Sequence, residues 1–311
     1  MDKKIKVLYI AGTGRNGSTI LENILGQLDG FFSVGEVHFI WERGLLQNQR
    51  CGCGVPHREC DVWHSIIQQA FGFVSEDQAI KWNNIRQKKT RLRRIFWHIS
   101  ENLAPNDLEQ DEYVWVLENL YKSIANFSGC QVIVDSSKHP MYLALLKLIP
   151  TFEIYTVHLV RDPRAVSFSW MKPKPSKDPN APKTMASMQR CKSAIVWLSW
   201  NTLIEFFGSK MGNRYIRINY EDFIVRPKQT IRKIQDYLDE GKGRLPFVTN
   251  KVVDIKMTHT ISGNPSRFNS GKIKLREDIR WLINMKIWDK IFVTILTLPI
   301  LMYYKYPIIR K

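Results

Sequence analysis

The stretch GTGRNGSTIL, residues 12–21, has the spacing of a loop that binds phosphate groups, with one departure from the usual pattern. In that pattern a glycine, four residues, a second glycine and a lysine precede a serine or threonine. Gly12, Gly17 and Thr19 hold the expected positions, but Ser18 stands where the lysine belongs. Such a loop binds anionic oxygens through backbone N–H groups at the start of a helix. The stretch therefore predicts an anion site whose cation comes from another residue.

A second group of residues suited to phosphate lies in VHLVRDPRAVSFSW, residues 157–170. We expect a strand to end at Val160, with Arg161 directly after it and Ser169 two turns along the next helix. An arginine can bind phosphate oxygens through two parallel hydrogen bonds, and a serine hydroxyl can donate another. A lone arginine at a strand end is usually a salt-bridge residue, but the phosphate loop beside it favours a shared anion site.

The segments that must position these residues alternate between strands and helices. Apolar, β-branched runs predict strands at residues 5–11, 31–34, 131–136, 153–160 and 214–220, and helical spacing is found at 18–28, 141–149 and 191–208. This alternation predicts a three-layer α/β fold with a parallel sheet of about five strands. Ligands bind at the carboxyl ends of such strands. We therefore expect the anion site there, in an arrangement like the nucleotide site of P-loop NTPases.

We expect residues 1–311 to form one domain with a helical insertion at about 75–128 and an apolar helical segment at about 285–305. The apolar run 291–304 is shorter than the ~20 residues that cross a bilayer. We interpret it as a helix docked on the core, with a membrane-surface anchor as the alternative. The segment 171–184 is rich in proline and lysine and should be an extended, mobile loop.

The composition favours anionic partners. Lys and Arg number 46 against 29 acidic residues, a formal charge of +17, which suits nucleotides, acidic lipids, polyanionic glycans or nucleic acid. We find no motif that reads nucleic acid and do not expect it as a partner. The first residues lack signal-peptide features, and five cysteines then predict a reducing, cytoplasmic setting, with the inner face of a membrane as a further option.

With these two motifs in this order, the chain resembles the sulfotransferases that use 3′-phosphoadenosine 5′-phosphosulfate (PAPS). Its arginine-containing loop is more similar to the carbohydrate, tyrosyl-protein and bacterial branches than to the cytosolic branch acting on phenols and steroids. The resemblance implies that the loop binds the 5′-phosphosulfate with Arg15 as its cation. It also implies that Arg161 and Ser169 bind the 3′-phosphate.

Three further segments resemble motifs of the same family. NYEDF (219–223) resembles a segment whose tyrosine lies near the nucleotide, and VDSSKHP (134–140) one whose lysine reaches the sulfuryl group. HTISGNPSRF (259–268) resembles a late glycine-containing loop that closes over the 3′-phosphate. The residues that we expect to bind PAPS are therefore Gly14, Arg15, Asn16, Gly17, Ser18, Thr19, Arg161, Ser169, Tyr220, Gly263, Asn264 and Arg267.

The expected catalytic residues are Glu36, Arg15 and Lys138. Glu36 follows the second predicted strand, and related branches place a glutamate base there. His38 is an alternative base because an unperturbed imidazole suits neutral pH; His139 is another, although its spacing from the family's histidine differs by one. No metal is expected to be required, since a transferring sulfuryl group carries less negative charge than a phosphoryl group.

The cysteine-rich stretch CGCGVPHREC, residues 51–60, is a separate feature. Cys51, Cys53 and Cys60, with His57 or His64, supply enough ligand atoms for zinc. Their spacing is not the paired Cys-x-x-Cys form that indicates zinc strongly. We prefer a structural loop near the acceptor site, with a metal site as the alternative.

The expected activity is in-line transfer of the sulfuryl group of PAPS to an acceptor hydroxyl on a sugar, glycolipid or secondary metabolite. An amine acceptor is not excluded, a glycan or lipid-linked acceptor would suit the charge, and the oligomeric state is not predicted. A P-loop kinase is one alternative, weakened by the missing lysine. Another is a non-catalytic protein that binds polyanions or membranes through the basic run 86–94 and the apolar C-terminal segment.

Overall fold

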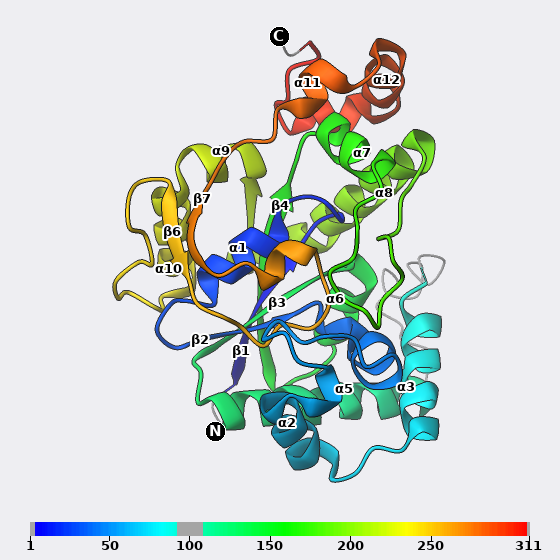
Figure 1. The fold of residues 1–311 in the computed structure, drawn as a ribbon, viewed down its shortest axis with the longest axis vertical. Coiled ribbons are helices and arrows are strands. Elements are labelled where there is room, and N and C mark those ends of the chain that lie inside the picture. Colours follow the sequence, from blue (N-terminus) through cyan, green and yellow to red (C-terminus); the bar gives the residue numbers. More distant parts are fainter. Residues whose placement is uncertain (1–3, 92–107, 310–311) are drawn as a thin grey trace.

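A sheet of five parallel strands lies at the centre of the molecule (Figure 1). The computed structural model describes residues 4–91 and 108–309. In spatial order the strands are β2 (Phe31–Gly35), β3 (Val132–Lys138), β1 (Ile5–Ala11), β4 (Phe152–Val160) and β5 (Tyr215–Asn219). Each predicted strand matches an observed one with ends that differ by at most two residues, and the α/β fold class is confirmed.

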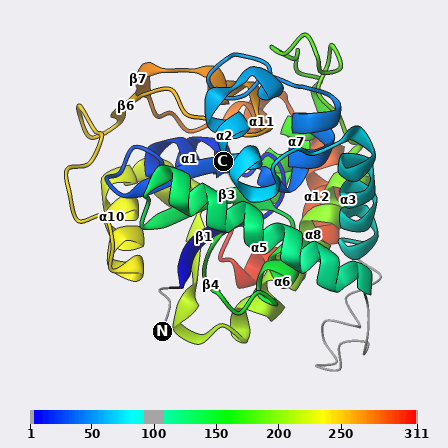
Figure 2. The ribbon, with the colours of Figure 1, turned by 90° about the horizontal axis from the view of Figure 1, so that it is seen from below.

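Helices cover both faces of this sheet (Figures 1 and 2). The helices are α1 (Ser18–Leu25), α2 (Asp61–Phe71), α3 (Glu76–Lys89), α5 (Leu108–Ser128), α6 (Pro140–Leu146), α7 (Pro163–Met171), α8 (Arg190–Ser209), α9 (Tyr220–Val225), α10 (Pro227–Leu238), α11 (Arg280–Asn284) and α12 (Ile287–Tyr303). The shorter helical turns are η1 (Val37–Phe39), η2 (Ile40–Leu46), η3 (His57–Glu59), η5 (Gly212–Arg214) and η6 (Pro265–Phe268). A separate antiparallel pair, β6 (Val252–Ile255) and β7 (Gly271–Lys274), was not predicted.

Alternate residues of the strands feed two hydrophobic cores, because successive side chains of a strand point to opposite faces of the sheet. Val7 and Tyr9 of β1 pack in the core that contains α5 and α6. Leu8 and Ile10 pack in the core that contains α1 and α10. This double burial fixes the strand register, and with it the position of every residue at the strand ends.

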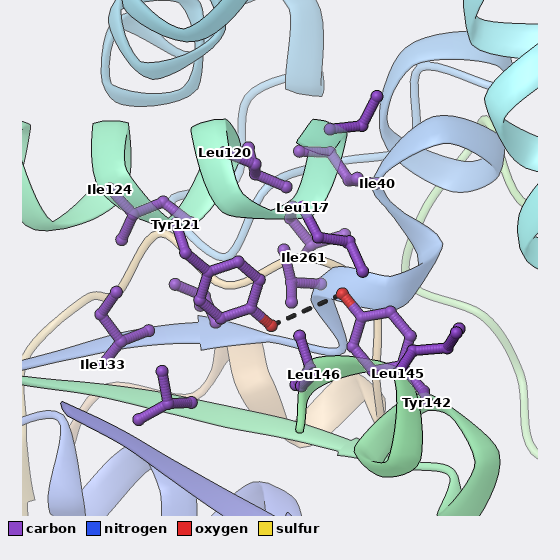
Figure 3. Packing of buried hydrophobic residues seen from close by; sticks show 14 of the residues in the cluster. Ile40, Leu117, Leu120, Tyr121, Ile124, Ile133, Tyr142, Leu145, Leu146 and Ile261 are labelled. Carbon is purple, nitrogen blue, oxygen red and sulfur yellow. Dashed lines mark hydrogen bonds between the residues drawn. The ribbon is translucent and has the colours of Figure 1, made fainter. Parts of the chain in front are cut away.

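Two buried tyrosines connect the α5–α6 core to the end of β3 (Figure 3). The hydroxyl of Tyr121 donates to Asp135 Oδ2 at 2.6 Å, and the hydroxyl of Tyr142 lies 3.5 Å from that of Tyr121. Asp135 Oδ1 in turn accepts a hydrogen bond from the N–H of Ser137 at 2.8 Å. Burial raises the pKa of Asp135 to about 6 despite these bonds. The network holds the backbone directly before Lys138.

The range predicted as a helical insertion contains α3 and α5. A capping box formed by Ser75 and Gln78 starts α3. Helix α5 packs against β1 and β3 and forms part of the layer that covers the sheet; Figure 2 shows it crossing this face. Residues 92–94, the end of the basic run, lie outside the described residues.

The C-terminal apolar segment forms α12, which docks on α7 and α8 (Figure 1). It buries Val293 and Leu301, while Trp288 and Ile295 on its other side are 76% and 67% exposed. Within residues 4–91 and 108–309, no helix combines the length and the apolar character that crossing a membrane would need.

Candidate active site

A cleft of about 680 Å³ lies at the carboxyl ends of the parallel strands, and residues that follow or end β1, β2, β3 and β4 line it. Its lining is strongly basic, as an anion site requires. The cations are Arg15, Arg43, Lys138, Arg161, Lys174, Lys177 and Arg267, against the carboxylates of Glu36, Glu42 and Asp178. Twelve of the fourteen predicted site residues line this one cleft; Asn16 and Tyr220 do not.

The loop between β1 and α1 is shaped by its own backbone and by Asn16. Arg15 and Gly17 have φ angles of 70° and 95°, in the left-handed region, and a Cβ on Gly17 would overlap the ring of Tyr220. Asn16 Nδ2 donates to the carbonyl of Leu159 at 2.9 Å, and its Oδ1 accepts from the N–H of Ser18 at 3.1 Å. The Asn16 side chain therefore holds the loop against β4 and is not available to a ligand.

Arg15 supplies a cation where the usual lysine is absent. Its guanidinium lies 4.8 Å from the ring of Trp170, whose Nε1 donates to the carbonyl of Gly14 at 3.2 Å. Burial lowers the pKa of Arg15 from its usual value. Among the described residues no carboxylate forms an ion pair with Arg15, and its Nε is buried without a hydrogen-bond partner. Arg15 Nη2 also donates to the carbonyl of Ala186 at 3.5 Å, and Nη1 lies 3.6 Å from Met185 Sδ. Stacking and these long contacts position the side chain, and its Nε retains hydrogen-bonding capacity.

Arg161 and Ser169 line the same cleft. Arg161 Nη1 donates to the carbonyl of Arg15 at 3.0 Å, and its guanidinium lies 4.6 Å from the ring of Tyr220. Asp278 is 3.6 Å from Nη2. Tyr220 itself does not line the cleft, but its ring packs against two residues that do, Arg161 and Gly17.

Glu36 and Lys138 form an ion pair across the ends of β2 and β3. Lys138 Nζ lies 2.6 Å from Glu36 Oε1 and 2.8 Å from the carbonyl of Ser136. Arg43 approaches the other carboxylate oxygen to 4.0 Å. Burial alone would raise the pKa of Glu36, but the charges of Lys138 and Arg43 outweigh it, so this pKa is lowered. The carboxyl group is ionised at neutral pH.

A buried glutamate beneath this pair was not predicted. Glu22 of α1 accepts hydrogen bonds from Ser33 Oγ at 2.8 Å and from the N–H of Gly35 at 2.5 Å. Its other oxygen bonds Ser136 Oγ at 2.6 Å. Burial raises the pKa of Glu22 to about 7 although these bonds oppose the shift. Glu22 therefore holds together the backbone next to Glu36 and Lys138.

The two histidines that the sequence offered as alternative bases line the cleft; His38 is buried and His139 is partly buried. His139 Nδ1 accepts from the N–H of Met141 at 3.2 Å, and its ring packs 4.6 Å from that of Trp200. Burial lowers the pKa of His139 to about 4, and it lowers the pKa of His38 well below the usual value. Both rings are neutral at pH 7 and are weaker bases than ordinary histidines.

The late loop lies beside Glu36. The N–H of Ile261 donates to the carbonyl of Val34 at 2.9 Å, and the N–H of Glu36 donates to the carbonyl of Ile261 at 2.7 Å. A Cβ on Gly263 would lie 3.5 Å from Glu36 Oε1. Within the described residues, no hydrogen bond links Gly263, Asn264 or Arg267 to Arg161 or Ser169. The loop therefore borders the end of the cleft that holds Glu36.

Arg267 and Asn264 use their side chains within the protein. Arg267 donates to the carbonyls of Thr260 and Arg50 at 2.8 and 2.6 Å. Asn264 Oδ1 accepts from the N–H of Ser266 at 3.1 Å and caps η6. Both residues line the cleft, but these bonds make them supports of the loop.

The segment 171–184 folds over the cleft, and several of its residues line it. The N–H of Ser176 donates to the carbonyl of Lys183 at 2.9 Å, and the N–H of Met185 donates to the carbonyl of Lys174 at 2.8 Å. Asp178 Oδ2 also accepts from the N–H of Arg50 at 2.6 Å. These hydrogen bonds, within the loop and to Arg50, give the segment a defined path over the cleft. The composition of the segment does not reveal them.

A family profile matches residues 8–241, and its description is the sulfotransferase family. The chain belongs to the sulfotransferase family. The matched residues include the phosphate loop, Glu36, Lys138, Arg161 and Ser169. No curated protein sequence matches this sulfotransferase.

Two solved structures share the fold of this sulfotransferase. The sulfotransferase domain of the Synechococcus PCC 7002 olefin synthase is 16% identical with a TM-score of 0.55, over 99% of this chain and 98% of that one. The sulfotransferase domain from the curacin biosynthetic pathway is 17% identical with a TM-score of 0.54, over 98% and 99%. Family and fold together support a sulfotransfer reaction, in preference to the kinase alternative.

Proposed function

We propose that this sulfotransferase moves the sulfuryl group of PAPS to an acceptor hydroxyl. The observation that carries the proposal is the bond between Arg161 and the phosphate loop, 3.0 Å long, inside a basic cleft. PAPS has anionic groups at its 5′ and 3′ positions, so it needs two neighbouring anion sites. The loop at Gly14–Thr19 and the pair Arg161 and Ser169 provide them.

In this proposal the backbone N–H groups of Asn16, Gly17 and Thr19 and the hydroxyls of Ser18 and Thr19 bind the 5′-phosphosulfate. Arg15 adds the positive charge that Ser18 cannot supply. Arg161 and Ser169 bind the 3′-phosphate, and the ring of Tyr220 fixes the orientation of Arg161.

Glu36 is the proposed base. A bond forms between the acceptor oxygen and sulfur while the bond from sulfur to the phosphate oxygen breaks, and the acceptor proton passes to the Glu36 carboxylate. The products are a sulfate ester and adenosine 3′,5′-bisphosphate, and Glu36 later loses its proton to solvent. Lys138 pairs with Glu36 in this structure, and we propose that it turns to the sulfuryl oxygens when PAPS binds. Loss of that partner would raise the pKa of Glu36 and make it a better base.

The acceptor side of the cleft contains Phe39, Trp200 and Met188 beside the two histidines. Such aromatic and apolar surface suits the ring face of a sugar or the body of a lipid-linked or other small-molecule acceptor. The exposed apolar face of α12, with Trp288 and Ile295 beside Lys286 and Lys290, suits peripheral binding to an anionic membrane. We propose that the sulfotransferase meets its acceptor there.

Competition between nucleotides tests the choice of donor. Adenosine 3′,5′-bisphosphate should bind without Mg²⁺ and should displace a labelled PAPS, whereas ATP with Mg²⁺ should not. An acceptor screen with PAPS labelled in its sulfuryl group then detects transfer. Tight binding of ATP with Mg²⁺, together with no binding of the bisphosphate, would refute the proposal.

A further inference from the structure

Four side chains that bind soft metal ions meet outside the cleft. The Sγ atoms of Cys51, Cys53 and Cys60 and a ring nitrogen of His259 all lie within 4.8 Å of one another. Cys53 Sγ is 3.8 Å from Cys60 Sγ, and His259 Nδ1 is 3.3 Å from Cys60 Sγ and 3.9 Å from Cys51 Sγ. None of the four lines the cleft, and catalysis as proposed above does not use them.

The distances of 3.8, 3.3 and 3.9 Å are close to those between ligands of one tetrahedral zinc ion. Zinc–sulfur bonds of about 2.3 Å and zinc–nitrogen bonds of about 2.0 Å place two sulfurs about 3.8 Å apart and a sulfur and a nitrogen about 3.5 Å apart. A disulfide would instead require sulfurs about 2.05 Å apart, and all three cysteines are free thiols. Three cysteines and one histidine are an established ligand set for structural zinc.

The backbone around the cluster is arranged so that the thiols converge. The N–H of Cys51 donates to the carbonyl of Val55, and that of Gly54 donates back to the carbonyl of Cys51, both at 2.8 Å. Cys60 directly precedes α2, where the helix dipole favours a thiolate. Trp63 Nε1 donates to the carbonyl of His259 at 2.6 Å and fixes the fourth side chain against this loop.

We propose that Cys51, Cys53, Cys60 and His259 form a structural zinc site. Its partners come from segments about two hundred residues apart, and other contacts join the same segments. The N–H of Gly52 donates to the carbonyl of Thr260 at 2.9 Å, and a Cβ on Gly52 would lie 2.5 Å from the carbonyl of Thr258. The ion would therefore fasten the cysteine loop to the strand-like segment that pairs with β2 next to Glu36.

The proposal revises the sequence-based preference for a loop without metal, and it changes the fourth ligand. His57 is buried and stacks on Trp63 at 5.5 Å, outside the cluster, and His64 is exposed on α2. His259 is therefore the proposed fourth ligand, in place of His57 or His64. Cys51 and Cys60 are buried while Cys53 and His259 are partly exposed, so the ion would be shielded but open to chelators on one side.

Metal analysis of the full chain, purified from cells grown without added zinc, tests the proposal. The wild-type protein should contain about one zinc atom per chain, released when a mercurial titrates its thiols. Cys60→Ser and His259→Ala should each reduce the content to below about 0.2 atom per chain. Cys191→Ser, which removes the exposed cysteine of α8, and His64→Ala should leave it unchanged. These are matched controls for the loss of a thiol and of an imidazole.

A second measurement does not depend on whether the variants fold. Wild-type protein stripped of metal and refilled with Co²⁺ should show the visible absorption bands of a tetrahedral, thiolate-ligated ion. Wild-type protein that holds no zinc and takes up neither zinc nor Co²⁺ would overturn the proposal, as would full zinc content in both ligand variants. Three reactive thiols in the denatured, unreduced chain, where the proposal expects five, would reveal a Cys–Cys bond and would also overturn it.

Discussion

Arg161 Nη1 donates a hydrogen bond of 3.0 Å to the carbonyl of Arg15, although the two residues are 146 positions apart. The bond joins the end of β4 to the phosphate loop after β1. Because β1 and β4 are neighbours in the parallel sheet, their carboxyl ends meet at one edge. Two motifs that could each bind an anion thus open into one cleft.

Replacing Glu36 by glutamine should remove the proposed base while preserving the shape of the site. We expect kcat to fall by about 10²–10⁴ because no carboxylate is then present to take the proton of the acceptor hydroxyl. Binding of adenosine 3′,5′-bisphosphate, measured by calorimetry, should stay close to the wild-type value. His38→Gln and His139→Gln test the alternative bases and should lower kcat by less than about tenfold. Near-full turnover of Glu36→Gln would show that another group takes the proton.

Arg15→Ala and Lys138→Ala should each lower kcat by about 10²–10⁴, because each removes a cation from the place where charge develops. Arg15→Lys restores the charge without the planar guanidinium, so it should recover part of the loss. Steady-state kinetics at saturating PAPS measures both effects. An Arg15→Ala protein with near-wild-type kcat would remove that residue from the mechanism.

The strands, and the place of the two expected phosphate-binding motifs at the strand ends, could be predicted because they depend on local patterns. The run at residues 5–11 is apolar and β-branched and ends in Gly12, and the observed β1 has the same bounds. Arg161 and Ser169 lie at the spacing that a strand end followed by a helix imposes. Consequently the predicted elements bring both motifs to one edge of the sheet.

The remaining features depend on contacts between distant segments. Nothing near Glu22 distinguishes it from a surface residue of an amphipathic helix, and only the packing of α1 against β2 and β3 buries it. His259 meets the cysteines across about two hundred residues. Arg267 was expected to bind the nucleotide, and in this structure its side chain bonds the backbone carbonyls of Thr260 and Arg50. Motif spacing does not reveal side-chain direction.

The buried carboxyl group of Glu22 should make stability depend on pH. Its pKa is raised to about 7 in the folded protein from an ordinary value of 4.5, so the folded state holds the proton more tightly. The stabilisation is fully present below pH 4.5 and is lost as the pH rises through 7. The Glu22→Gln side chain stays neutral at every pH. The free energy of unfolding of the variant minus that of the wild type should therefore be about 2 kcal/mol larger at pH 8 than at pH 5. Urea denaturation of both proteins at the two pH values measures this, and a difference that does not change with pH would contradict it.

The apolar face of α12 should bind anionic vesicles. Trp288→Ser combined with Ile295→Ser removes two exposed apolar side chains, and vesicle affinity in a flotation assay should fall by at least about tenfold. Trp115→Ser is the matched control, since Trp115 is 54% exposed on α5, far along the chain from α12. Equal vesicle binding by the double variant and the control would exclude this face as the membrane contact.

If two anion sites in one cleft bind opposite ends of one nucleotide, calorimetry with nucleotides that carry one or two phosphates should reveal it. Wild-type protein should bind adenosine 3′,5′-bisphosphate at least about a hundredfold more tightly than adenosine 5′-monophosphate, because only the former reaches Arg161 and Ser169. Arg161→Ala should abolish most of that preference and leave the affinity for the monophosphate nearly unchanged. Arg280→Ala, which removes the other cation at Asp278, should preserve it. Equal affinities of the wild-type protein for the two nucleotides, or an unchanged preference in Arg161→Ala, would show that Arg161 does not bind the 3′-phosphate.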